Sequence, residues 1–281
     1  MKTKERAESI IQKLEKAYPN AHCELEFETP FQLLVATILS AQCTDKRVNI
    51  VTRDLFQKYR RPKDFAEVGQ TELENDIKST GFYRNKAKNL RAMARDLLEL
   101  YGGEVPRSMS ELVKLAGVGR KTANVVLGNA FSVEEGIVVD THVARLAHRF
   151  KLTTKRDPEK IEADLMRLIP RSQWTNFSHW LIWHGRRRCF ARNPDCPNCE
   201  VASVCPSFDR FVKSGAVRER THHRDSENTK RDGISVGRKE MASDPATLTP
   251  PRNSADIGAL RRRGVAVRRL ALVRRKKAIA K

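Results

Sequence analysis

The chain has 281 residues, of which 40% are hydrophobic and 31% charged, and its formal net charge at pH 7 is +20. This length is enough for one large domain or two smaller ones with hydrophobic cores of their own. The positive charge favours a polyanionic partner, most commonly nucleic acid, and the alternative is a basic solvated surface without such a partner.

The first predicted helix lies at the N-terminus, where apolar residues share one helical face: Ala7, Ile10, Ile11, Leu14 and Tyr18. The segment lacks the apolar core of a signal peptide. The longest uncharged apolar stretch, FQLLVATILSAQC, is too short to cross a bilayer. We therefore expect a cytoplasmic, nucleoid-associated protein without a membrane contact, whose thiols stay reduced.

Helical spacing of apolar residues continues to about residue 212, in FQLLVATILSAQ, KNLRAMARDLLELY, KTANVVLGNAF, IEADLMRLI and FSHWLIWHG. Thr29-Pro30 and Asp157-Pro158 are start signals for two of these helices. No alternating run of strand length is present, and GIVVD at residues 136–140 comes nearest. The sequence predicts an all-α fold.

The segment LAGVGRKTANVV predicts a tight turn between a helix at about residues 108–115 and a second helix. Gly117 and Gly119 permit the turn, and free amides at the start of the second helix, beside Arg120, form an anion site. On a basic protein the expected anion is a DNA phosphate. The alternative is an ordinary helix turn.

Lys121 lies at the start of that second helix, where the helix dipole disfavours a cation by a few tenths to about 1 kcal/mol. This position favours the neutral amine of Lys121 over its ammonium form. A neutral amine is a nucleophile that forms Schiff bases with carbonyl-like carbons. Further along, VVDTHVAR places Asp140 after an apolar stretch, where a partly buried carboxylate is expected near the lysine. Considered alone, Asp140 fits better as the N-cap of the helix that follows, and one side chain can serve both roles.

Four of the six cysteines lie close together in the spacing C-x6-C-x2-C-x5-C: Cys189, Cys196, Cys199 and Cys205. In a reducing compartment, four such thiols predict a metal centre and not a disulfide framework. The spacing alone supports a structural zinc and an iron–sulfur cluster about equally, although zinc sites more often use two close cysteine pairs.

The composition changes after about residue 212. Residues 213–281 hold 19 Lys or Arg against 7 Asp or Glu, which is +12 of the net +20, and no aromatic residue follows Phe211. Such a segment cannot bury enough apolar surface to offset its ordering entropy. We expect a basic, disordered tail that binds a polyanion or is simply solvated.

The hairpin LAGVGRKTANVV, the segment VDTHVAR and the four-cysteine loop, in this order, resemble the endonuclease III family of DNA glycosylases. SAQCTDKRVN and GFYRNKAKNL match the family too, so the resemblance runs from about residue 5 to 212. Ala116 is a departure, because the family usually has proline at this position. The change is expected to loosen the turn slightly.

The resemblance implies a two-domain helix-hairpin-helix glycosylase fold with the active site in the cleft between the domains. Residues 24–134 would form a six-helix bundle with the hairpin, and residues 1–23 and 135–212 an iron–sulfur domain. The four cysteines would hold a [4Fe–4S] cluster that orders a DNA-binding loop and performs no redox step in base removal. The candidates for phosphate contacts around it are Arg186, Arg187, Arg188 and Arg192.

The implied activity is base excision repair: removal of oxidised or damaged pyrimidines from double-stranded DNA, then cleavage 3′ to the abasic site by β-elimination. The base is flipped from the stack, Lys121 attacks C1′ and Asp140 assists. Gln42 matches the residue that fills the hole left by the flipped base, and Phe82 matches a wedge that opens the base step. Without the resemblance, both residues would be interpreted as helix-end and loop packing.

Two alternatives stay open. One is a mismatch-specific glycosylase for thymine or adenine, although the adenine type lacks the hairpin lysine and needs an acid where this chain reads VATILSA. The other is a non-catalytic DNA-binding protein, against which Lys121 and Asp140 together argue. In each case we expect a monomer bound to DNA, with damaged bases or abasic sites as the target of the enzyme.

Overall fold

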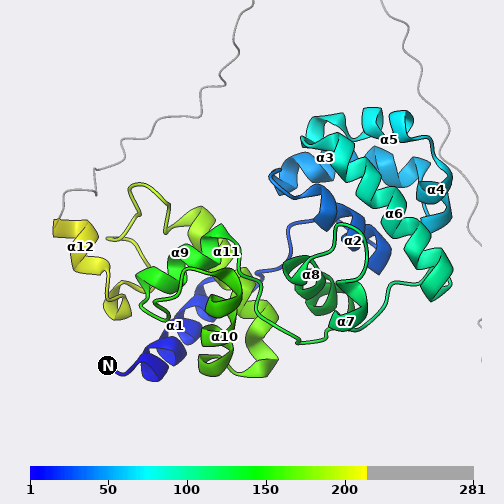
Figure 1. The fold of residues 1–281 in the computed structure, drawn as a ribbon. Coiled ribbons are helices and arrows are strands. Elements are labelled where there is room, and N and C mark those ends of the chain that lie inside the picture. Colours follow the sequence, from blue (N-terminus) through cyan, green and yellow to red (C-terminus); the bar gives the residue numbers. More distant parts are fainter. Residues whose placement is uncertain (214–281) are drawn as a thin grey trace, which may run out of the picture. The chain divides into compact units, whose positions relative to one another are not determined.

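The computed structural model describes residues 1–213, so the expectations for the tail from residue 214 onward lie outside the described residues. Over the described residues all regular secondary structure is helical, which confirms the all-α prediction (Figure 1). The segment GIVVD, the nearest approach to a strand pattern, has no regular secondary structure. None of the described helices combines the length and apolar character needed to span a membrane.

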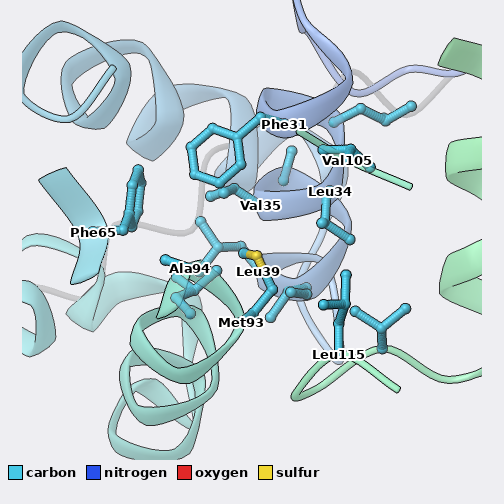
Figure 2. Close-up of a cluster of buried hydrophobic side chains, with 14 of the residues drawn as sticks. Phe31, Leu34, Val35, Leu39, Phe65, Met93, Ala94, Val105 and Leu115 are labelled. Atoms are coloured by element: carbon cyan, nitrogen blue, oxygen red, sulfur yellow. The ribbon is translucent and has the colours of Figure 1, made fainter. Parts of the chain in front are cut away.

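One hydrophobic cluster is built from residues 25–127. The helices of this part are α2 (Pro30–Leu39), α3 (Asp45–Lys58), α4 (Pro62–Glu67), α5 (Gln70–Asp76), the 3-10 helix η1 (Lys78–Thr80), α6 (Tyr83–Tyr101), α7 (Met109–Leu112) and α8 (Arg120–Phe131). Helix α2 is buried at eight of its ten positions, as expected for a helix that is apolar on every side. In Figure 2 its side chains Phe31, Val35 and Leu39 lie beside Phe65 and Met93.

A second hydrophobic cluster combines the N-terminal helix with the later part of the chain. Its helices are α1 (Thr3–Ala17), α9 (Thr141–Arg149), α10 (Pro158–Leu168), η2 (Arg171–Gln173), α11 (Trp174–Arg187) and η3 (Ala202–Val204), followed by α12 (Phe208–Lys213). Helix α1 packs against α10 and α11 (Figure 1). It does so with the face that the sequence predicts, including Ile10 and Leu14.

All of the described residues belong to one compact unit. The two hydrophobic clusters within this unit follow the ranges of the predicted division into residues 24–134 and residues 1–23 with 135–212. The division into two domains itself stays a prediction.

Candidate active site

Lys121 and Asp140 line the same cavity, of about 120 Å³. Lys121 comes from α8, on the side of the first hydrophobic cluster, and Asp140 from the start of α9, on the side of the second. The cavity is therefore built from segments of both clusters. It brings together the amine and the carboxylate that the sequence pairs.

Lys121 is the second residue of α8 and its side chain is exposed. The N-cap of this helix is Gly119, which has no side chain to bond the first amides. A helix start without a side-chain cap leaves donors for water or a ligand. Lys121 therefore lies beside both a cavity and a set of uncapped amides.

The two glycines of the hairpin differ in backbone conformation and in what a side chain would meet there. Gly117 has φ +77°, and a Cβ there would lie 2.9 Å from the Cβ of Asn89, so another residue would be strained and would collide. Gly119 has φ −94°, and a Cβ on it would meet open space. The turn itself thus needs only Gly117, and Gly119 keeps the start of α8 open. The helix before the turn, α7, is shorter than the predicted 108–115 and ends at Leu112.

Asp140 is the N-cap of α9, as the residues around it predict. Its Oδ1 accepts a hydrogen bond from the backbone N–H of Val143 at 2.8 Å. A carboxylate at a helix N-terminus is stabilised in its charged form by the helix dipole. Among the described residues no donor bonds its Oδ2, so one oxygen serves the helix while the half-buried side chain lines the cavity.

Two further residues, His179 and Asn129, line the cavity although no sequence pattern singles them out. The Nε2 of His179 lies 2.8 Å from the Oδ1 of Asn129. Burial lowers the pKa of His179 to about 4, so the ring is neutral at physiological pH and donates from Nε2 to the amide oxygen. The only available signal was a histidine inside the apolar run FSHWLIWHG, and such a residue is more often part of a core.

Gln42 and Phe82 both have backbone conformations that are unusual for residues other than glycine. Gln42, just beyond α2, has φ +54°, and Phe82, the N-cap of α6, has φ +49°. Both side chains are exposed, and Phe82 keeps 63% of its surface in solvent. A left-handed backbone costs a residue other than glycine about 1–3 kcal/mol, whereas a single exposed aromatic ring is not unusual by itself. The structure gives Phe82 no packing role, while the insertion of these residues into DNA stays a prediction.

Arg120, predicted to contact DNA, forms an internal ion pair. Its Nε and Nη2 donate to the two carboxylate oxygens of Glu162 at 2.8 and 3.0 Å. Glu162 lies on α10 and also accepts a hydrogen bond from Asn124 at 2.8 Å. Arg120 therefore ties α8 to α10, and its phosphate contact stays a prediction.

The arginines before the cysteine loop are likewise paired with carboxylates. Arg187 donates to Glu24 at 3.1 Å and lies over the ring of Trp183, with 3.8 Å between guanidinium carbon and ring centroid. Arg188 donates to Asp195 at 2.6 Å and to Glu200.

Arg186 pairs with Glu24 and with Asp45, the latter at 2.8 Å. Arg192 is exposed. The guanidinium groups of Arg187 and Arg188 both have carboxylate partners within the protein. Their contacts with DNA stay predictions.

The four cysteines of the loop fit a metal group with several ligand positions. Cys189 and Cys196 are buried, Cys199 and Cys205 half-buried. Burial, together with the neighbouring cysteines, raises the pKa of the Cys196 thiol to about 11 and that of Cys199 to about 12. Buried thiols this close together become thiolates only when a cation compensates their charge.

The separation of the cysteine sulfurs can be compared with the geometry of a single zinc ion. Among the described residues, the one group of three potential ligands whose donor atoms all lie within 4.8 Å of one another is His184, Cys199 and Glu200. No three of the cysteine sulfurs come that close. One tetrahedral zinc, with Zn–S of about 2.3 Å, would hold its sulfurs about 3.8 Å apart. The described cysteine sulfurs are therefore not already arranged around a single tetrahedral zinc ion.

Comparisons with known proteins agree with this geometry. The family described as HhH-GPD superfamily base excision DNA repair protein matches residues 35–171. Endonuclease III of a Synechocystis species is 54% identical over 204 residues, which cover 73% of this chain and 93% of that protein.

Two solved structures are similar as well. A non-covalent endonuclease III–DNA complex has a TM-score of 0.73 at 45% identity, covering 76% of this chain and all of that one. A trapped endonuclease III–DNA covalent intermediate has a TM-score of 0.72 at 45% identity, covering 75% of this chain and 100% of that one. The likeness extends over nearly the whole length of these relatives and confirms the resemblance seen in the hairpin, the VDTHVAR segment and the cysteine loop. The chain belongs to the endonuclease III family of base excision DNA repair proteins.

Proposed function

We propose that this protein is a bifunctional DNA glycosylase and abasic-site lyase that removes oxidised or damaged pyrimidines from double-stranded DNA. The observation that carries the proposal is the cavity shared by Lys121 and Asp140 in a chain of this family. The related endonuclease III structures contain DNA, in one case as a trapped covalent intermediate. We place this activity in the cytoplasm, on chromosomal DNA. We also propose that the protein acts as a monomer.

The proposed reaction starts when the neutral Nζ of Lys121 attacks C1′ of a flipped nucleotide. The electron pair of the glycosidic bond leaves with the base, which takes up the proton that the amine releases. The C1′–O4′ bond of the sugar ring then breaks, its electron pair stays on O4′, which takes up a proton from solvent, and the lone pair of Nζ completes a protonated imine with C1′. Loss of a proton from C2′ then expels the 3′ phosphate oxygen and cleaves the strand. The carboxylate of Asp140, which caps α9 through one oxygen, stabilises the positive charge that develops on the sugar.

Gln42 and Phe82 are proposed to enter the duplex during base flipping. Separating a base step costs a few kcal/mol, and an inserted aromatic ring offsets part of this cost. The exposed ring of Phe82 and the strained backbone at both positions support this role. We further propose that the uncapped amides after Gly119 bind a phosphate, which the open space at this glycine supports.

We also propose that Cys189, Cys196, Cys199 and Cys205 hold a [4Fe–4S] cluster. When bound, this group supplies a rigid centre that orders the loop. Arg149 donates from Nη1 to the Sγ of Cys189 at 3.1 Å and to the carbonyl oxygen of Phe190 at 2.7 Å, so this side chain fixes the start of the loop. Metal analysis tests the proposal: iron with little zinc is expected, and one zinc per chain would overturn it.

A set of lesion-bearing duplexes tests the proposed substrate. The protein is incubated with three duplexes that contain an oxidised pyrimidine, a G·T mismatch or a mismatched adenine. We expect strand cleavage at the oxidised pyrimidine and loss of that cleavage in Lys121→Gln. Preferential removal of thymine or adenine from the mismatches would assign the chain to a different glycosylase activity, and binding without cleavage of any duplex would indicate a non-catalytic protein.

A further inference from the structure

Lys86 is a buried lysine without a carboxylate partner among the described residues. It lies on α6 and is 5% exposed. Its Nζ donates to the carbonyl oxygens of Leu39 and Thr80, both at 2.8 Å. Burial lowers the pKa of this ammonium group. Lysine is almost never fully buried unless it is paired, so this placement calls for an explanation.

The two carbonyl groups belong to the two segments that carry Gln42 and Phe82. Leu39 is the last residue of α2, and Gln42 follows three positions later. Thr80 is the last residue of η1, and Phe82 follows two positions later. The C-terminal carbonyls of helices lack intrahelical partners and carry partial negative charge, so a lysine satisfies both. One ammonium group thus joins the ends of two segments that are 41 residues apart in sequence.

Simple core packing does not account for a charge at this position. A leucine or methionine would fill similar space without the desolvation cost of an ammonium group. What the charge adds is a fixed distance between two backbone segments. Lys86 is itself in the first turn of α6, where its backbone N–H donates to the carbonyl oxygen of Phe82 at 3.1 Å. It therefore holds Phe82 through the backbone and the end of α2 through its side chain.

We propose that Lys86 is a positioning residue for opening the DNA duplex: its ammonium group fixes the spacing between Gln42 and Phe82, so that both side chains enter the same lesion site. The inference rests on the proposed roles of these two residues. Lys86 acts on base extrusion and does not touch the chemistry at Lys121. Its loss should therefore affect duplex substrates and spare a sugar that is already accessible.

The test compares Lys86→Met, which keeps the length and removes the charge, with Lys88→Met on the same helix. Lys88 is exposed and serves as the matched control. Base excision from a lesion duplex is measured in single turnovers, and extrusion is followed by the fluorescence of 2-aminopurine beside the lesion. Imine formation is measured separately by borohydride trapping on a single-stranded abasic oligonucleotide, which needs no duplex opening.

For Lys86→Met we expect about a tenfold slower excision from duplex, a smaller 2-aminopurine signal and unchanged trapping on the single strand. Lys88→Met should match the native chain in all three assays. Equal losses on duplex and single strand, or no loss on duplex, would overturn the inference. Failure of the native chain to trap at all would instead refute the proposed function.

Two more variants make the result independent of folding defects. Adding Lys86→Met to Phe82→Ala should slow excision no further than Phe82→Ala alone, because both changes remove the same step. Effects that multiply would contradict the inference. If Lys86→Met loses its helical circular dichroism, the uncharged Lys86→Gln replaces it, and a duplex rate equal to that of the native chain would count against the role of the ammonium group that contacts the two carbonyls.

Discussion

Replacing Glu162 with glutamine is expected to lower the free energy of unfolding by about 2 kcal/mol. The side chain of Glu162 is 6% exposed, and its oxygens accept two hydrogen bonds from Arg120 and one from Asn124. Glutamine keeps the shape but turns one acceptor into a donor that faces another donor.

The magnitude follows from these contacts. A hydrogen bond to a charged group contributes about 1.5–3 kcal/mol, and leaving its buried partner unsatisfied adds to the loss. The side chain of Arg120 is 39% exposed, so water recovers part of what the guanidinium loses. Together these effects place the expected change near the lower end of that range.

Urea unfolding at constant temperature, followed by circular dichroism, measures the change directly. In a thermal scan the same loss should lower the Tm by roughly 4–8 °C for a folded unit of this size. Glu159→Gln is the control, because Glu159 lies on the same helix and is exposed. A destabilisation of Glu162→Gln no larger than that of Glu159→Gln would refute the reasoning.

Three further predictions follow from the site and its surroundings. Gly117→Ala should destabilise the chain by about 1–2 kcal/mol, because of its positive φ and the contact with Asn89, while Gly119→Ala should leave stability unchanged in the same urea experiment. Equal effects of the two changes would contradict the different roles of these glycines. Asp140→Asn should keep the helix cap and therefore the stability, yet lower the yield of trapped imine by about tenfold or more. Full trapping by this variant would remove Asp140 from the chemistry. Because burial lowers the pKa of His179 to about 4, its neutral form stabilises the fold above the unfolded-state pKa of about 6.5. This contribution should be lost as the pH falls from about 6.5 to 4. When the free energy of unfolding is measured across that pH window, its slope against pH should be flatter for His179→Gln than for the native chain. An unchanged slope would show that the ring does not contribute to the pH dependence.

The helices that the sequence predicts best are those with local signals. Thr29 and Asp157 each accept a hydrogen bond from a backbone N–H three residues later, as their positions before proline indicate. The apolar spacing of α1 predicts which of its residues are buried. Such features depend on neighbours within a few positions, so the sequence contains them.

The features that the sequence does not predict depend on residues far away along the chain. Arg120 looks like a phosphate contact until its partner Glu162, 42 residues further on, is seen. Lys86 in GFYRNKAKNL looks like any helical lysine, and only the folded chain brings it to Leu39 and Thr80. The pairing of His179 with Asn129 likewise spans 50 residues. These contacts form only when the helices pack.

Borohydride reduction in the presence of abasic duplex DNA tests the central claim most directly, since it converts an imine at Lys121 into a stable covalent link. We predict a trapped protein–DNA adduct for the native chain and none for Lys121→Gln, while Lys114→Gln, at an exposed lysine just before the hairpin, traps like the native chain. An undiminished adduct with Lys121→Gln, or no adduct with the native chain, would contradict the claim that this amine bonds to the sugar.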